Sequence, residues 1–330
     1  MTSATPHPFT EPENPVAQAV AFTEFGGPEV LRMLALARPV AGDGEVVVRV
    51  HAATVNPTDL MMRSGQQAAM MAGLQPPFIA GMEFSGEVHS VGAGVAALRP
   101  GQRVMGVVNP RRPDGGAHAQ FVCVSAASAV ALAPAVDLVE AATVPMNGLT
   151  SLAALQMLSL QPRQTLLVTG GAGVLAAYII QLAKSAGVTV IADAAPSRIN
   201  DLRALGADEV VPRGIEMDAA VRRLVPSGVD GLIDTALLGD RAAALVRDGG
   251  GAVSVRKTHP FTNSRVRGHQ VSVVEHFGDT ASLQRLAQLL ADGKLKPRVG
   301  LRMPPSEAAQ AHALTQQGGL GGRIVLDFSQ

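Results

Sequence analysis

A glycine-rich turn between a buried strand and a helix is the feature that most constrains how this chain can fold. The run Thr165–Thr169 (TLLVT) is continuously apolar, which is typical of a buried parallel strand. The pattern G-x-G-x-x-A follows at 171–176, and a helical stretch begins within it. Glycines let the backbone approach a diphosphate there, and the helix start presents free N–H groups to it. The turn predicts a dinucleotide site made of Gly170, Gly171, Ala172, Gly173, Val174 and Leu175.

An acidic residue stands where such a site needs one. Asp193 ends the next predicted strand, twenty residues after Gly173. A carboxylate at this place accepts hydrogen bonds from the adenosine ribose and repels a 2′-phosphate, which favours NADH over NADPH. Arg198, five residues further on, could instead meet a 2′-phosphate, or it could be a solvated cation where a helix starts. The plainer alternative is a glycine-rich turn in an α/β domain that binds nothing.

Two different residue patterns divide the chain into two predicted domains. Its 330 residues exceed one ordinary domain, and 47% of them are hydrophobic, enough for sizeable cores. Residues 18–135 hold short β-rich runs between glycine and proline turns, which predicts a barrel or sandwich. Residues 136–294 alternate apolar strands with helices, which predicts an α/β domain with a doubly wound parallel sheet. Residues 1–17 are polar and proline-rich, and we expect a flexible tail rather than a signal peptide.

Three further features of the α/β domain follow from the pattern. Val136–Leu160 reads as helix broken at Pro145 and at Gly148. Val271–Val274 reads as an edge strand, which could pair across a two-fold axis in a homodimer. Ligands of such sheets bind at the carboxyl ends of the strands. Residues that follow or end two strands there are therefore assigned to cofactor contact: Thr235, Ala236, Ser254 and Val255.

Composition excludes several classes of protein. Lysine plus arginine and aspartate plus glutamate each number 27, so there is no electrostatic case for binding nucleic acid or a charged membrane surface. The single cysteine, Cys123, excludes an intrachain disulfide and a cysteine-rich zinc site. No apolar run approaches the length that spans a membrane. These features predict a cytoplasmic protein whose partner is a small molecule.

Several segments carry a family likeness. They are VNPTD (55–59), GMEFSGEV (81–88), LRPGQRVMG (98–106), VPMNGLTS (144–151), LGADEVV (205–211) and GGRIVLDF (321–328). In their order and spacing, the chain resembles the zinc-independent medium-chain dehydrogenase/reductases, specifically the quinone oxidoreductase-like (zeta-crystallin-like) branch. The likeness runs from about Ala19 to Asp327.

The resemblance implies a fold and an activity. It implies a GroES-like β-barrel domain over residues 18–135, completed by residues 295–330, and a Rossmann domain over residues 136–294. It implies NAD(P)H-dependent hydride transfer to a quinone or an α,β-unsaturated carbonyl compound, with NADPH the commoner cofactor of the family and a homodimer a common assembly. Zinc-dependent relatives carry a cysteine where Asn56–Thr58 stand and a histidine where Met82 stands. We therefore expect no catalytic metal.

Hydride transfer without a metal needs a hydrogen-bond donor for the oxygen that gains charge. The resemblance places Asn56, Thr58 and Asp59 in the cleft, although all three residue types also favour helix caps. It places Asn147 and Thr150 beside the nicotinamide. The catalytic candidates are Asn56, Thr58, Asp59 and Thr150, and Met61 and Met62 are candidates for an adaptable substrate pocket.

Two alternatives to a quinone or enone reductase stay open. One is a biosynthetic enoyl or ketone reductase of the same fold. The other is a family member that binds a nucleotide or an apolar ligand without redox activity, which Met61 and Val174 favour because many relatives have tyrosine and glycine at these positions.

Overall fold

A six-stranded parallel sheet carries the glycine-rich turn. The computed structural model describes residues 16–329, and this sheet has the strand order β11-β10-β9-β12-β13-β14. Chain order reverses between β9 and β12, as in doubly wound folds, so the predicted parallel sheet is confirmed. The strands are β9 (Thr165–Thr169), β10 (Thr189–Ala194), β11 (Glu209–Pro212), β12 (Val229–Asp234), β13 (Val246–Ser254) and β14 (Arg267–Gln270).

Helices cover both faces of this sheet because alternate strand residues point to opposite sides. In β9, Leu166 and Val168 pack in one core cluster with α3, α4 and α5, whereas Leu167 packs in another with α6 and α7. The helices of this lobe are α3 (Pro145–Leu158), α4 (Val174–Ser185), α5 (Ile199–Leu205), α6 (Met217–Leu224), α7 (Asp240–Ala243) and α8 (Thr280–Ala291).

The second lobe is mainly antiparallel. Its largest sheet has the order β15-β16-β3-β5-β6-β8, with β7 also on β3, and a smaller sheet has the order β2-β1-β4. These strands are β1 (Val16–Phe22), β2 (Arg32–Ala37), β3 (Glu45–Val55), β4 (Phe78–Ile79), β5 (Glu83–Val91), β6 (Arg103–Val107), β7 (Phe121–Ser125), β8 (Ala129–Ala131), β15 (Val299–Met303) and β16 (Arg323–Asp327). The helices beside them are α1 (Pro57–Arg63), α2 (Leu138–Ala141) and α9 (Ala308–Gln317).

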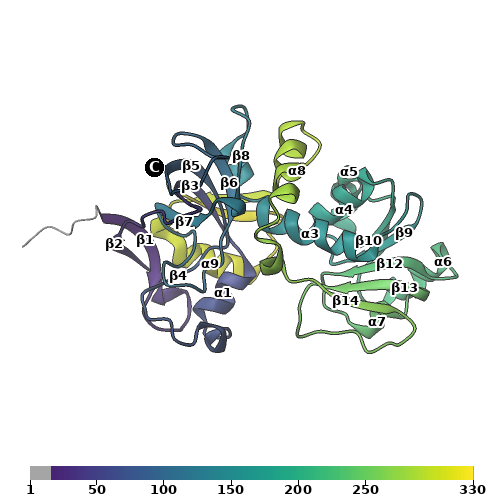
Figure 1. The fold of residues 1–330 in the computed structure, drawn as a ribbon. Helices are drawn as coiled ribbons and strands as arrows, with labels where there is room; N and C mark the ends of the chain where they lie inside the picture. The colour runs from purple at the N-terminus through teal and green to yellow at the C-terminus, as the bar shows by residue number, and fades with distance from the viewer. Residues whose placement is uncertain (1–15, 330) are drawn as a thin grey trace, which may run out of the picture.

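The end of the chain returns to the antiparallel lobe. Strand β16 pairs with β3, with Ile324 opposite Val55. Figure 1 shows the yellow C-terminal elements lying among the purple and blue strands. This return brings residues near 323 against residues near 57, and both line the site described below.

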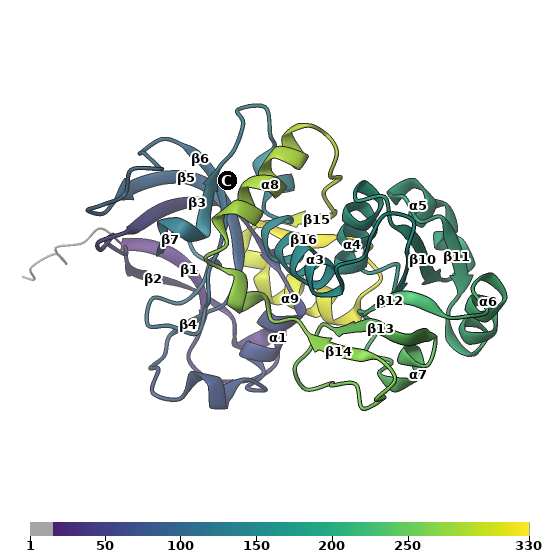
Figure 2. The ribbon, with the colours of Figure 1, turned by 45° about the vertical axis from the view of Figure 1, so that its right-hand side comes forward.

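An apolar cluster joins the two lobes. Met105 and Val130 of the antiparallel lobe pack in one cluster with Leu149 of α3, Tyr178 of α4 and Leu283 of α8. Figures 1 and 2 show α3 and α8 between the two sheets. The shared core fixes one lobe against the other and so sets the shape of the cleft between them.

Local expectations need three corrections. The edge strand is β14, four residues before the predicted Val271–Val274, and residues Val273–His276 form a 3₁₀ helix. Gly148 does not break α3; a side chain there would meet Leu286 Cδ1 at 2.6 Å, so the glycine lets α8 pack closely. Of the predicted tail, residues 1–15 lie outside the described residues and Val16 already belongs to β1. Within residues 16–329 we find no helix with the length and apolar character that crossing a membrane requires.

Candidate active site

A cavity of about 530 Å³ lies between the two lobes, within the size range of small-molecule sites. The Rossmann-like lobe contributes the start of α4 and the ends of β12 and β13, and the antiparallel lobe contributes α1 and the segment after β6. Its walls include Thr58, Met61, Gln67, Met70, Met82, Arg111, Met146, Asn147, Thr150, Gly173, Val174, Leu175, Thr235, Val255 and Arg323.

Gly173 stands where this cavity meets a second one. It is the N-cap of α4, with φ −75° and ψ 158°, a conformation open to any residue. A side chain there would meet the Gly170 carbonyl oxygen at 3.1 Å and would otherwise project into open space. Gly173 lines both cavities, and without a side chain it leaves the helix start open to each of them. The surroundings fit the diphosphate of a dinucleotide.

The other glycines serve the fold of the turn itself. Gly170 has φ +66°, which favours glycine, and a side chain there would meet Thr235 Oγ1 at 2.8 Å. A side chain on Gly171 would meet the Asp193 carbonyl oxygen and Leu202 Cδ2, both at 2.7 Å. Ala172 lines the second cavity and Leu175 the first. The predicted turn therefore divides into residues that shape the bend and residues that face a ligand.

The second cavity, of about 480 Å³, is lined by two arginines of the Rossmann-like lobe. They are Arg198, which forms an ion pair with Asp201 at 3.2 Å, and Arg213, which follows β11. Asp193 is only 7% exposed and lies within β10 rather than at its end. Its carboxylate accepts a hydrogen bond from the Gly171 N–H at 3.3 Å, and burial raises the pKa of Asp193.

Arg323 is a half-buried cation between the two cavities, and the sequence reading missed it. It begins β16, lines both cavities, and donates through Nη2 to Asn147 Oδ1 at 2.9 Å. Burial lowers the pKa of Arg323. Among the described residues, Arg323 Nε and Asn147 Nδ2 are buried without a hydrogen-bond partner. A bound anion or hydroxyl would satisfy such donors. The one sequence signal was an arginine in the quoted segment GGRIVLDF.

Two threonines that line the cavity differ in whether their hydroxyl proton is available to a ligand. The Thr150 hydroxyl donates to the Met146 carbonyl oxygen at 2.7 Å, so its oxygen can only accept from a ligand. The Thr58 oxygen accepts from Gln67 Nε2 at 3.2 Å, which leaves the Thr58 proton for another acceptor. Thr58 is therefore the better of these two candidates for a donor to substrate.

Asn56 and Asp59 hold the start of α1 and do not line the cavity. Asn56 is fully buried and donates through Nδ2 to Glu83 at 3.0 Å and to Thr54 at 2.8 Å. The Asp59 carboxylate accepts the backbone N–H of Asn56 at 2.7 Å and of Gly81 at 2.9 Å. The structure therefore does not bring the predicted catalytic residues Asn56 and Asp59 to the cavity wall: the Asn56 amide N–H groups and the Asp59 carboxylate bond within the protein, and Asn56 Oδ1 is buried without a partner among the described residues.

Glu83 links the two lobes and was also missed. Besides Asn56, its carboxylate accepts the backbone N–H of Met146 at 2.8 Å, in the first turn of α3. A carboxylate at a helix N-terminus is stabilising. Burial raises the pKa of Glu83. Glu83 therefore fixes the helix that carries Asn147 and Thr150 against the antiparallel lobe.

The two adjacent methionines of α1 face different ways. Met61 lines the cavity with Met70, Met82 and Met146. Met62 is 1% exposed and packs in a core cluster of the antiparallel lobe with residues such as Val20 and Leu326. The pocket assignment of Met62 is wrong because successive helix residues point about 100° apart.

The strand-end residues also divide. Thr235 and Val255 line the cavity, and the Thr235 hydroxyl donates to the Thr169 carbonyl oxygen at 2.6 Å. The Ala236 N–H donates to Thr169 Oγ1 at 3.2 Å, and Ser254 is buried with its hydroxyl on the Arg256 carbonyl oxygen at 3.1 Å. Ala236 and Ser254 thus brace the ends of β12 and β13 rather than line the cavity.

Comparison with known proteins fits this geometry. Residues 42–135 match the family model described as Alcohol dehydrogenase GroES-like domain, and residues 205–326 match Zinc-binding dehydrogenase. The chain is 28% identical to 2-methylene-furan-3-one reductase of Solanum lycopersicum, over 94% of this chain and 78% of the relative. It is 27% identical to the chloroplastic NADPH-dependent alkenal/one oxidoreductase of Arabidopsis thaliana, over 94% of this chain and 79% of that relative. The solved quinone oxidoreductase of Coxiella burnetii superposes with a TM-score of 0.82 at 28% identity, over 94% of this chain and 99% of that one.

The chain belongs to the quinone oxidoreductase-like branch of the medium-chain dehydrogenase/reductases.

The residues of this medium-chain dehydrogenase/reductase do not fit the zinc of its zinc-dependent relatives. Asn56–Thr58 and Met82 offer neither a thiolate nor an imidazole. Within residues 16–329, no three histidine, cysteine, aspartate or glutamate side chains are grouped so that they could hold a metal ion. We therefore derive no step through a metal.

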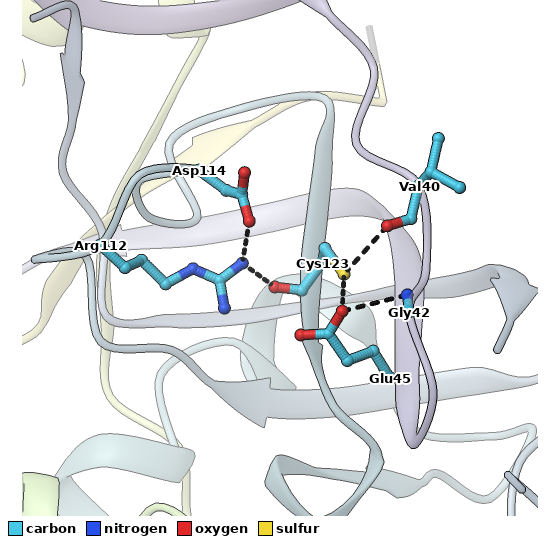
Figure 3. Close-up of polar contacts among 6 residues, drawn as sticks. All are labelled: Val40, Gly42, Glu45, Arg112, Asp114 and Cys123. Atoms are coloured by element: carbon cyan, nitrogen blue, oxygen red, sulfur yellow. Dashed lines mark hydrogen bonds and ion pairs between the residues drawn. The ribbon is translucent and has the colours of Figure 1, made fainter. Parts of the chain in front are cut away.

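The single cysteine lies on β7 and does not line the cleft cavity. Figure 3 shows the Cys123 thiol directed at Glu45 and at the Val40 carbonyl oxygen. Its Sγ lies 3.4 Å from Glu45 Oε2. Burial and the neighbouring Glu45 raise the pKa of Cys123 to about 11, so the thiol stays protonated near neutral pH.

Proposed function

We propose that this enzyme uses NAD(P)H to reduce a quinone or an α,β-unsaturated carbonyl compound, with no metal in the step. The observation that carries the proposal is the single cavity lined by both the start of α4 and the methionines of the antiparallel lobe. Such a cavity holds a nicotinamide and an apolar acceptor face to face. The names of the relatives in Solanum lycopersicum and Arabidopsis thaliana support the acceptor class.

The chain's own residues would hold the dinucleotide as follows. Backbone N–H groups at the start of α4, beside Gly173, and the Arg323 guanidinium would meet the diphosphate. Asn147 Nδ2 would donate to a ribose hydroxyl, and the Thr150 oxygen would accept from the nicotinamide side. When bound, the cofactor supplies the hydride.

The antiparallel lobe would act on the acceptor. Met61, Met70 and Met82 give an adaptable apolar wall. The Thr58 hydroxyl, whose oxygen is held by Gln67, would donate to the oxygen that gains charge as hydride arrives. Water would deliver the proton to the remaining carbon or oxygen.

For the cofactor, we propose NADPH over NADH. The Asp193 carboxylate, which favoured NADH in the sequence, is bonded to the Gly171 N–H. Two cations, Arg198 and Arg213, line the second cavity, where the adenosine end would lie. Arginine suits a 2′-phosphate. Replacement of Asp193 by serine tests the alternative, because a shift of selectivity toward NADPH would show that Asp193 reads the ribose.

We further propose a homodimer in the cytoplasm. The outer strand of the parallel sheet, β14, has no neighbour on its far side among the described residues. A free edge of this kind can pair with a second copy across a two-fold axis. Light scattering of the purified protein measures the oligomeric state.

Titration of NADPH and NADH, followed by nicotinamide fluorescence, tests the proposal. Turnover is then measured on a panel of quinones and enones. We expect binding and oxidation of the bound cofactor on at least one of these acceptors. Failure to bind either cofactor would refute a reductase, and binding without turnover on the whole panel would favour the ligand-binding alternative.

A further inference from the structure

The cleft cavity carries positive charge that its own walls do not neutralise. Four cationic side chains line it: Arg111, Arg256, Lys257 and Arg323. Among the described residues that line it there is no carboxylate. The chain as a whole has equal numbers of acidic and basic residues, so this excess is local. A cleft lined by one sign of charge attracts ligands of the opposite sign.

Three of these cations are accounted for by an ion pair, by the proposed cofactor contact or by exposure to solvent. Lys257 forms an ion pair with Glu275. Arg323 lies beside Gly173 and would meet the diphosphate of the cofactor. Arg256 is exposed at the mouth of the cavity. Arg111 remains, in the segment after β6 on the acceptor side.

Arg111 is held by a neutral group. Its Nη1 donates to Gln67 Oε1 at 2.9 Å, and among the described residues its side chain makes no ion pair. Burial lowers the pKa of Arg111, and the carboxylate that opposes this effect is Asp59, itself buried on two backbone N–H groups. A half-buried cation with a neutral partner gains from an anion brought by a ligand.

The position of Arg111 sets what that ligand looks like. Gln67 joins Arg111 to Thr58, because Gln67 Nε2 donates to Thr58 Oγ1 at 3.2 Å. The guanidinium is therefore fixed relative to the proposed donor for the reacting oxygen. Its remaining N–H groups form a planar fork, which suits a carboxylate. Apolar Met61 and Met70 line the same cavity.

Resting on the proposed function, we propose that Arg111 binds a carboxylate on the substrate, so that the preferred acceptors are α,β-unsaturated ketones that end in a carboxylate. The carboxylate is an anchor and is unchanged by the reaction. Hydride still arrives at the carbon β to the carbonyl, and a proton from water completes the α carbon. Arg111 thus determines specificity.

The neighbouring arginine is a matched control. Arg112 turns away from the cavity and donates to the Cys123 carbonyl oxygen, and it pairs with Asp114 at 3.3 Å, as Figure 3 shows. Arg111→Gln and Arg112→Gln remove the same charge one residue apart. Only the first removes it from the cavity wall.

The experiment uses two acceptors with the same reacting group. One is a methyl enone with a terminal carboxylate two methylene groups from the double bond, and the other is its methyl ester. We expect wild type to prefer the acid. Arg111→Gln should lower kcat/KM for the acid about 10- to 100-fold, mainly through KM, and leave the ester within about threefold. Arg112→Gln should leave kcat/KM unchanged for both the acid and the ester. Arg111→Lys should keep part of the preference for the acid.

Each other outcome has a distinct meaning. An equal fall in kcat for acid and ester would mean that Arg111 acts on the carbonyl oxygen, and no preference for the acid in wild type would also overturn the proposal. A third acceptor, the coenzyme A thioester of a short enoic acid, carries its negative charge on phosphates. If Arg111→Gln lowers kcat/KM for this thioester alone, the carboxylate assignment is wrong. If Arg111→Gln does not fold, two other measurements test the proposal. One is the ratio of kcat/KM for acid and ester in Arg111→Lys, and the other is whether the saturated acid inhibits wild type more strongly than its ester does. Wild type that binds cofactor and reduces no quinone, acid or ester would instead refute the proposed function.

Discussion

Replacement of Gly173 by valine separates cofactor binding from folding. The φ of −75° suits any residue, and the nearest atom to an added side chain is the Gly170 carbonyl oxygen at 3.1 Å. The isopropyl group would instead project into the open space at the start of α4, where Gly173 lines both cavities. Loss of two N–H bonds to a charged diphosphate costs about 3 kcal/mol, which is about 100-fold or more in Kd.

Fluorescence titration with NADPH measures this loss, and thermal unfolding of the free protein measures the fold. We expect Gly173→Val to unfold within a few degrees of wild type while its NADPH affinity falls at least about 100-fold. Gly171→Ala is the control, because its new side chain meets Asp193 and Leu202 at 2.7 Å and should cost about 1–3 kcal/mol of stability. Unchanged NADPH affinity in Gly173→Val would refute the diphosphate assignment.

Three further predictions concern charge. Arg213→Gln should weaken NADPH binding about tenfold and leave NADH unaffected, as measured by the same titration, and equal loss of both would contradict the 2′-phosphate assignment. Burial holds the pKa of His312 well below 6.5, so its contribution to stability is full above that value and is lost as pH falls below it. From pH 7.5 to 5.5 wild type should lose more of its free energy of unfolding in urea than His312→Gln does, and parallel curves for the two proteins would refute this. Cys123, with a pKa of about 11, should react with a thiol reagent at neutral pH only on unfolding, and rapid labelling of the native protein would contradict its burial beside Glu45.

Short-range patterns in the sequence predicted the parallel sheet and its turn. An apolar strand, a glycine bend and a helix are adjacent in the chain, so their geometry follows from local backbone preferences. The same locality explains the errors. Met61 and Met62 share one predicted pocket in the sequence, yet a helix points them to different sides. Gly148 reads as a helix breaker, yet α8 packs against it.

The residues that complete the site were not predictable from local patterns. Gln67 and Arg111 lie 44 residues apart in the chain and meet only in the fold, and Glu83 of β5 reaches the start of α3 only because the two lobes pack together. Arg323 reaches the cofactor side because β16 returns to pair with β3.

The sequence by itself therefore determined the fold class, the family and the place of the glycine-rich turn, since each rests on residues that are neighbours within short segments of the chain. Which polar groups face the cavity, and which are consumed inside the protein, was decided only by the tertiary structure. The physical reason is that a donor such as Asn56 or Thr150 has few protons, and distant segments of the fold determine where they go.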